Sequence, residues 1–311
     1  MSTRYEAIRP ERSVGRRARD QLMAAMPMAA ERRVRLPGVD TAVLEGGDGP
    51  PIVLLHGQGE FAAVWIRVIP DLVRTHRVIV PDLPGHGASV ASDSRLDTEA
   101  VLAWLDELID QTCRGWPPVL VGHLLGGAIA ARYAVRHGDR LAHLILVDTL
   151  GLGWFRPAPS FAMPMMSFVA RPTAKGRDRL FNRCFLDMQR VGEETGEQWQ
   201  PLLAYALDRA RTPSVQAALR SLVTRVGMRP IPPGDLAQIG VPTDLIHGRQ
   251  DLQVRLRTAE AASARYGWPL HVIEDCRDDP AAEQPEALLA ALRTAIGTSR
   301  DSRAPGEDKS P

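Results

Sequence analysis

Short runs rich in Val, Ile and Leu recur along this sequence of 311 residues, and longer segments with helical periodicity lie between them. A continuous apolar run of this kind is typical of a strand buried on both faces of a sheet. Strands that alternate with amphipathic helices pair in parallel, and the helices cover both faces. The sequence therefore predicts an α/β fold with a mostly parallel central sheet. The predicted strands lie at 51–57, 77–82, 118–123, 144–148, 243–248 and 270–275, and the predicted helices at 62–74, 97–113, 126–137, 256–266 and 283–296.

Two further strands are expected ahead of the parallel ones. Residues 33–46 alternate between polar and apolar side chains, and Asp48-Gly49 with two prolines ends the pattern. A period of two predicts half-buried strands, and a Gly- and Pro-rich break predicts a turn. These residues should therefore form two antiparallel strands. Asp97 precedes an amphipathic segment and is the expected N-cap of its helix.

The charge balance and the composition exclude several classes of protein. The 38 Lys and Arg residues oppose 37 Asp and Glu residues, and a net charge of +1 gives no electrostatic footprint for nucleic acid. A hydrophobic content of 44% with 24% charged residues is typical of a soluble globular protein. Because no stretch offers about 18 uncharged apolar residues, we expect no membrane partner. The oligomeric state is left open by the sequence.

The cysteines and the Gly-rich motifs predict neither a metal nor a cofactor. Cys113, Cys184 and Cys276 are far apart and show no CxxC spacing, which argues against a disulfide framework and a zinc site. No strand-linked GxGxxG or P-loop is present, so no nucleotide cofactor is expected. A protein with so few cysteines and no signal peptide pattern is expected in the cytoplasm.

The alternation of strands and helices is interrupted once, between 152 and 233. This region reads as helices with Pro breaks, and it holds five of the six Phe residues together with several Met residues. We interpret it as a helical lid inserted into a core formed by 31–151 and 234–297. The polar ends, 1–30 and 298–311, are expected to be an N-terminal extension that is partly disordered and a disordered tail.

Four segments, in order, resemble the α/β-hydrolase fold superfamily: HGQGEF at 56–61, PDLPGHGAS at 81–89, VGHLLGG at 121–127 and HGRQD at 247–251. Their order and spacing, with the inserted lid, cover about residues 33–297. The resemblance implies an oxyanion hole made of backbone N–H groups near Gly57, Gln58 and Leu125. It also implies that Asp251 is the acid of a catalytic triad.

The resemblance departs from the family pattern at two positions. The third position of G-x-S-x-G, which carries the nucleophile, is Leu124, and an isobutyl group cannot attack a carbonyl. The family's general base is a His in a C-G-H-x-x-x-x-E-x-P setting, and the segment 276–285 places Asp278 there. Loss of a triad nucleophile or base typically costs about a million-fold in turnover. Conventional serine-hydrolase chemistry is therefore not expected, although the framework around the site is kept.

Asp251 and Asp278 are the expected acid and base of the altered site. Two carboxyl groups in a desolvated cleft cannot both ionise cheaply, so one should titrate at raised pH. The alternatives are that Arg277 or another arginine neutralises them, or that both face solvent. A pocket with an apolar floor and roof is expected around them, although a structural role is favoured for His56 and His123 and packing for most of the Phe and Met side chains. The expected pocket residues are His56, Glu60, Phe61, His123, Leu124, Trp154, Phe155, Phe161, Met165 and Met166.

Three functions follow from this interpretation. The first is noncovalent work on an apolar small molecule, such as cyclisation, isomerisation or elimination in a biosynthetic pathway. The second is a non-catalytic pseudoenzyme that binds a ligand. The third is a hydrolase that uses a water activated by carboxylates.

Overall fold

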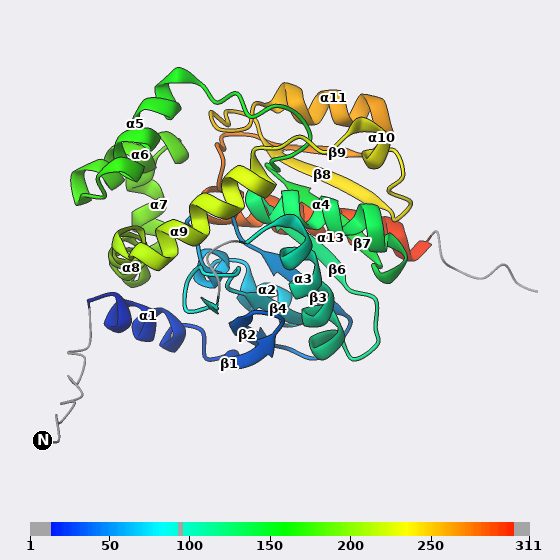
Figure 1. Cartoon of the computed structure of the whole chain (residues 1–311), viewed down its shortest axis with the longest axis horizontal. Helices are drawn as coiled ribbons and strands as arrows, with labels where there is room; N and C mark the ends of the chain where they lie inside the picture. Colours follow the sequence, from blue (N-terminus) through cyan, green and yellow to red (C-terminus); the bar gives the residue numbers. More distant parts are fainter. Residues whose placement is uncertain (1–13, 93–95, 302–311) are drawn as a thin grey trace, which may run out of the picture.

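A computed structural model describes the backbone of residues 14–92 and 96–301. Within these residues, nine strands form one sheet in the order β1-β2-β4-β3-β6-β7-β8-β9, with β5 paired to β2 (Figure 1). The first two strands are antiparallel to their neighbours, and the pairs from β4 through β9 are parallel. The predicted α/β fold is therefore confirmed. The strands are β1 (Ala29–Leu36), β2 (Val39–Gly46), β3 (Pro51–Leu55), β4 (Arg77–Pro81), β5 (Val90–Ala91), β6 (Val119–His123), β7 (His143–Val147), β8 (Thr243–Gly248) and β9 (Leu270–Ile273).

The central strands are buried throughout and mostly apolar, because both of their faces are covered. In β3, Ile52 and Leu54 belong to one core cluster, and Val53 and Leu55 belong to the other. Successive side chains of a strand point to opposite faces, so this alternation places one cluster on each side of the sheet. Helices α3 (Thr98–Cys113), α4 (Leu125–His137) and α11 (Leu256–Tyr266) cover the first cluster, and α2 (Ile69–Leu72) and α13 (Pro285–Asp301) cover the second.

Prolines explain where the predicted helices are shorter or divided. The segment 62–74 forms a 3-10 turn at Ala62–Trp65 and then α2, because Pro70 has no N–H and fits only the first turn of a helix. Likewise, α12 (Pro280–Glu283) ends before Pro285, which opens α13. The predicted tail begins too early, since the backbone of 298–301 continues α13; residues 302–311 lie outside the described chain. Asp97 is the N-cap of α3, as expected, and accepts the N–H of Ala100 at 2.9 Å.

The chain between β7 and β8 is helical. It contains α5 (Pro159–Ala170), α6 (Ala174–Cys184), α7 (Met188–Thr195), α8 (Trp199–Arg211), α9 (Pro213–Leu222) and α10 (Pro233–Leu236), and α5 and α6 lie at the edge of the molecule (Figure 1). The Phe and Met residues of this region divide between two environments. Phe161 and Phe185 are buried, whereas the side chains of Met163 and Met166 are 69% and 59% exposed. None of the described helices is long and apolar enough to cross a membrane.

The N-terminal segment holds a helix that the sequence analysis missed. Helix α1 (Val14–Ala24) buries Ala18 and Leu22 in a core cluster and packs against α8. The expectation that 1–30 lie outside the core was therefore wrong for α1, while 1–13 lie outside the described residues. The Arg-rich composition concealed this helix because Arg19 is buried and forms ion pairs with Glu31 at 2.5 Å and Asp82 at 3.0 Å.

Candidate functional site

A sharp turn joins β6 to α4 at Leu124, as the resemblance implied. Leu124 has φ 47° and ψ −108°, a conformation that side-chain-bearing residues rarely adopt. Its N–H donates to Val147 O at 3.0 Å, and its carbonyl accepts the N–H groups of Ala128 and Leu150, both at 3.1 Å. Leu124 is 2% exposed and packs in a core cluster. The turn is held by the surrounding backbone, and its side chain is apolar.

Two glycines permit this turn by close approach of backbone segments. A Cβ added to Gly122 would lie 2.5 Å from the carbonyl oxygen of Gly126. A Cβ added to Gly126 would lie 2.5 Å from the carbonyl oxygen of Leu55. Real Cβ atoms do not approach backbone oxygens this closely, so both positions require glycine. The turn geometry of the G-x-S-x-G pattern is thus kept without its serine.

Two of the backbone N–H groups expected to form an oxyanion hole, those of Gly57 and Leu125, are engaged by the chain's own side chains. The N–H of Leu125 donates to Gln58 Oε1 at 3.3 Å, which is a long hydrogen bond. The N–H of Gly57 donates to Glu60 Oε2 at 2.6 Å. The amide of Leu125 is therefore only weakly held by the side chain of Gln58, and rotation of that side chain would free it.

Asp251 and Asp278 are both buried, with exposed fractions of 6% and 4%. Asp251 follows β8, and its Oδ1 accepts the N–H groups of Gln253 at 2.6 Å and Val254 at 3.0 Å. Asp251 Oδ2 and Asp278 Oδ1 have no hydrogen-bond partner among the described residues. Burial, together with the negative charge of Asp251, raises the pKa of Asp278 well above its usual range. The expectation that one carboxyl of this pair titrates at raised pH agrees with this environment.

Neither alternative for this carboxyl pair holds. The guanidinium group of Arg277 donates to the backbone carbonyls of Asn182 at 2.8 Å and Phe185 at 2.7 Å, at the end of α6. The side chain of Arg277 therefore links the loop after β9 to the lid region by hydrogen bonds, and it does not neutralise Asp251 or Asp278. Since both carboxyl groups are buried, they do not point to solvent either.

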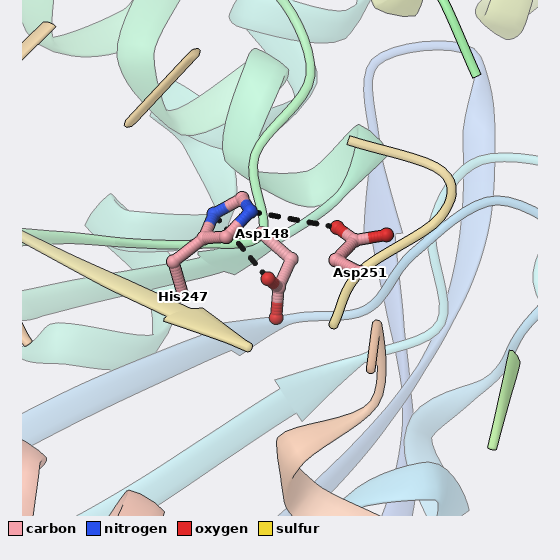
Figure 2. A group of neighbouring side chains, drawn as sticks. All are labelled: Asp148, His247 and Asp251. Atoms are coloured by element: carbon pink, nitrogen blue, oxygen red, sulfur yellow. Dashed lines mark ion pairs between the residues drawn. The ribbon is translucent and has the colours of Figure 1, made fainter. Parts of the chain in front are cut away.

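Sequence analysis missed two further members of this cluster, Asp148 and His247 (Figure 2). His247 Nδ1 lies 3.3 Å from Asp148 Oδ1, and His247 Nε2 lies 3.7 Å from Asp251 Oδ2. Burial raises the pKa of Asp148, and burial together with the charge of Asp148 raises the pKa of Asp251. The available signal was positional: both residues occupy the carboxyl ends of neighbouring parallel strands, where functional groups of α/β folds gather.

The ligand atoms of Asp148, His247 and Asp251 lie within 4.8 Å of one another, which is close enough for a metal ion. The imidazole is already engaged, because its Nε2 donates to the carbonyl of Val254 at 2.7 Å. Asp148 Oδ1 also accepts the N–H of Gly248 at 2.9 Å. These contacts are those of a hydrogen-bonded network that orders the loop after β8.

His123, at the end of β6, is part of a buried ion pair. Its Nδ1 lies 3.2 Å from Glu60 Oε2, and its Nε2 donates to the carbonyl of Asp278 at 2.5 Å. Burial alone would lower the pKa of His123, but the charge and hydrogen bond of Glu60 and the charges of Asp279 and Asp148 together outweigh burial and raise this pKa to about 10. The imidazole is therefore a cation at neutral pH, and it connects the turn at Leu124 to the loop that carries Asp278.

Half of the residues of the predicted pocket are buried in packing. Among them are His56, Phe61 and Phe161; His56 Nε2 accepts the N–H of Leu83 at 2.9 Å, which is a structural role. Met165 is half-buried on α5, and Met166 is exposed. That these residues line one pocket stays a prediction.

A cavity of about 420 Å³ lies beside the carboxyl cluster, between the loops that follow β7 and β8. Trp154 and Phe155, two of the predicted pocket residues, line it. Gln253, whose N–H donates to Asp251 Oδ1, also lines it. Val254, whose N–H also donates to Asp251 Oδ1, lines it as well, so the cavity and the carboxyl cluster are connected through these two residues.

The sequence of this chain matches known enzymes over most of its length. It is 28% identical over 259 residues to a pimeloyl-[acyl-carrier protein] methyl ester esterase of Aeromonas hydrophila, covering 81% of this chain and 97% of the relative. It is 32% identical over 211 residues to the esterase of the same name in Nitrosomonas europaea, covering 66% of this chain and 79% of the relative.

Solved structures share the fold. A carboxylesterase from Bacillus subtilis superposes with a TM-score of 0.76 at 19% identity, covering 91% of this chain and 99% of that chain. A 2-hydroxy-6-oxo-6-phenylhexa-2,4-dienoate hydrolase from Rhodococcus superposes with a TM-score of 0.73 at 24% identity, covering 86% and 99%. The sequence profile described as "Alpha/beta hydrolase family" matches residues 52–292. With the fold, the turn at Leu124 and this match together, the chain belongs to the alpha/beta hydrolase family.

Proposed function

We propose that this protein hydrolyses a carbonyl substrate without a covalent acyl-enzyme, using Asp251 and Asp278 as an acid–base pair. The observation that carries the proposal is the pair of buried oxygens, Asp251 Oδ2 and Asp278 Oδ1, which have no hydrogen-bond partner in the described chain. Burial and the negative charge of Asp251 raise the pKa of Asp278, while burial and the charge of Asp148 raise the pKa of Asp251. In the proposed reaction one carboxyl group of the pair acts as the base and the other as the acid.

The reaction balances with water as the co-reactant. The ionised carboxyl group takes a proton from water while the water oxygen bonds to the carbonyl carbon. The protonated carboxyl group gives its proton to the departing oxygen as the acyl–oxygen bond breaks. One water is consumed, the products are an acid and an alcohol, and the carboxyl pair returns to its starting protonation after one proton exchange with solvent.

Leu124 supports the absence of a covalent step. The family's G-x-S-x-G turn places a serine hydroxyl at this point. The chain keeps the turn and places a buried isobutyl group there, so we propose that the triad of this member is degenerate at Leu124 and Asp278. The relatives support hydrolysis as the reaction class, because they are named as esterases and hydrolases.

A second candidate is noncovalent rearrangement of a bound small molecule by the same carboxyl pair, as in isomerisation, cyclisation or elimination. The hydrogen bond from Leu125 N–H to Gln58 Oε1 favours it, because this contact occupies a donor that ester hydrolysis needs for the carbonyl oxygen. A protein that only binds its ligand would show neither reaction.

The experiment uses p-nitrophenyl butyrate with the full chain and three variants. Asp251→Asn and Asp278→Asn should abolish turnover above background, and Asp139→Asn, at an exposed position, should not change it. A fluorophosphonate probe should leave the protein unlabelled. Labelling, or unchanged turnover in both site variants, would overturn the proposal.

The second candidate is tested on small-molecule extracts incubated with the protein in H₂¹⁸O. Hydrolysis adds one labelled oxygen to the acid product, whereas isomerisation or cyclisation gives a product of unchanged mass. An extract that is unchanged in every component would contradict both reactions.

A further inference from the structure

The cavity between the loops after β7 and β8 is lined by three arginines, Arg156, Arg255 and Arg257. No Asp or Glu residue is among the residues that line it. Within the described chain, none of the three guanidinium groups has a carboxylate within ion-pair distance. Three cations that face one cavity repel each other, so an anion there would be strongly favoured.

The first turn of α11 lies at the same cavity. Arg255 is the residue before this eleven-residue helix, and Arg257 and Thr258 belong to its first turn; all three line the cavity. The helix has no acidic residue in its first turn and no side chain that caps it. The first N–H groups of a helix have no partner within the helix, and they carry partial positive charge. This end of α11 therefore adds to the positive potential of the cavity.

An independent observation comes from Gln253. Its side chain lines the cavity and is 4% exposed, yet its Nε2 has no acceptor among the described residues. A buried amide N–H without an acceptor is costly, and native proteins normally satisfy it. Gln253 lines the cavity, so rotation of its buried side chain would bring Nε2 to a ligand oxygen there and supply that acceptor.

Two aromatic residues also line the cavity. Trp154 and Phe155 line the cavity, and Trp154 is largely exposed, so its ring is available for contact. A volume of about 420 Å³ is suited to a small organic molecule. The cavity thus offers positive charge and aromatic surface, with a buried amide next to it.

We propose that this cavity binds the carboxylate or phosphate group of a small organic anion whose apolar body contacts Trp154 and Phe155. Gln253 joins the site to the carboxyl pair, since its own N–H donates to Asp251 Oδ1 at 2.6 Å. As a substrate site, this inference rests on the proposed function; as a binding site, it stands alone.

Binding is measured by calorimetry with the Asp278→Asn variant, which removes turnover from the experiment. The probes are phenylacetate, phenyl phosphate and the neutral isostere phenylacetamide. At least one anion should bind about tenfold more tightly than phenylacetamide, and its affinity should fall with added salt. Comparison of the two anions distinguishes a carboxylate site from a phosphate site.

A matched pair of variants tests the location. Arg257→Gln, in the cavity, should weaken binding of the preferred anion about fivefold or more. Arg265→Gln, an exposed position on the same helix, should leave the affinity unchanged. Equal effects of the two variants, or equal binding of phenylacetate, phenyl phosphate and phenylacetamide, would overturn the site. Loss of turnover in Asp278→Asn with the anion still bound would leave the site standing, so the two proposals fail separately.

Discussion

The imidazole of His123 donates to the backbone carbonyl of Asp278 across 2.5 Å, and so joins the end of β6 to the loop after β9. Because Nδ1 faces Glu60, both ring nitrogens carry protons and the ring is charged. This contact lets a residue beside the strained turn set the position of one member of the carboxyl pair. It also makes the stability of the protein depend on the protonation of one buried histidine.

The ion pair of His123 with Glu60 should make stability fall in alkaline solution. The pKa of His123 is raised from 6.5 to about 10, so its contribution is complete below about 6.5 and is lost as the pH rises toward about 10. The lowered pKa of Glu60 gives a contribution that is lost only in acid. Glu60→Gln should therefore cost about 3 kcal/mol near pH 6 and progressively less near pH 10. Denaturant unfolding at both pH values checks this, and a pH-independent difference would contradict it.

Asp278→Asn should stabilise the protein at alkaline pH. A raised folded-state pKa means that the native state retains a proton that the unfolded state has lost, so stability falls as the pH rises from about 4 toward the folded value. Asparagine has the same shape and removes this loss. The free energy of unfolding of the variant, relative to that of the original chain, should be about 1 kcal/mol or more higher at pH 8 than at pH 4. Asp139→Asn is the control, and parallel pH profiles for the two variants would refute the expectation.

The positive φ of Leu124 should reverse the usual order of stability, so that the Gly variant at this position is more stable than the Ala variant. Leu124→Ala removes a buried isobutyl group and should cost about 3 kcal/mol. Leu124→Gly removes the same group but relieves the strain at φ 47°, so it should be more stable than the Ala variant by about 1 kcal/mol. Thermal or denaturant unfolding of both variants measures the difference. A Gly variant less stable than the Ala variant would mean that the turn is unstrained.

Restoring both changed positions should restore covalent chemistry. Asp251 Oδ1 is occupied by two N–H groups, which leaves Oδ2 for an imidazole at position 278. Leu124→Ser combined with Asp278→His should therefore react with a fluorophosphonate and release a burst of p-nitrophenol. Each single variant should react at least about 100-fold more slowly. Adding Gln58→Ala, which frees the N–H of Leu125, should increase the burst. A silent triple variant would show that the framework cannot support the triad.

The fold was predictable because its signal is local and repeated. Runs such as 51–55 need both faces buried, which a parallel sheet covered by helices provides. The positions of Leu124, Asp251 and Asp278 after strands followed from the resemblance to the α/β-hydrolase fold. Helix α1 was not predictable in this way, since Arg19 is buried through ion pairs to Glu31 and Asp82, which are distant in sequence.

The pocket was predicted less well than the carboxyl cluster. Composition suggested that the Phe and Met residues of the insertion line an apolar pocket, but it does not tell which side of a helix faces the core. Phe161 is buried in packing, and Met163 is exposed. The sequence did not indicate a binding role for Arg255 and Arg257, because that role depends on the cavity that the fold forms at the start of α11.

The packing of α1 against α8 limits the routes by which a small molecule can enter the protein. Arg19 lies over the ring of Tyr205 on α8 at 5.6 Å, so the start of the chain anchors the middle of the insertion. Because α8 is anchored, we expect that the helices of the insertion do not open together as one rigid lid. We expect small molecules to enter and leave past Trp154, which lies between β7 and α5. The remaining helices of the insertion should stay in place.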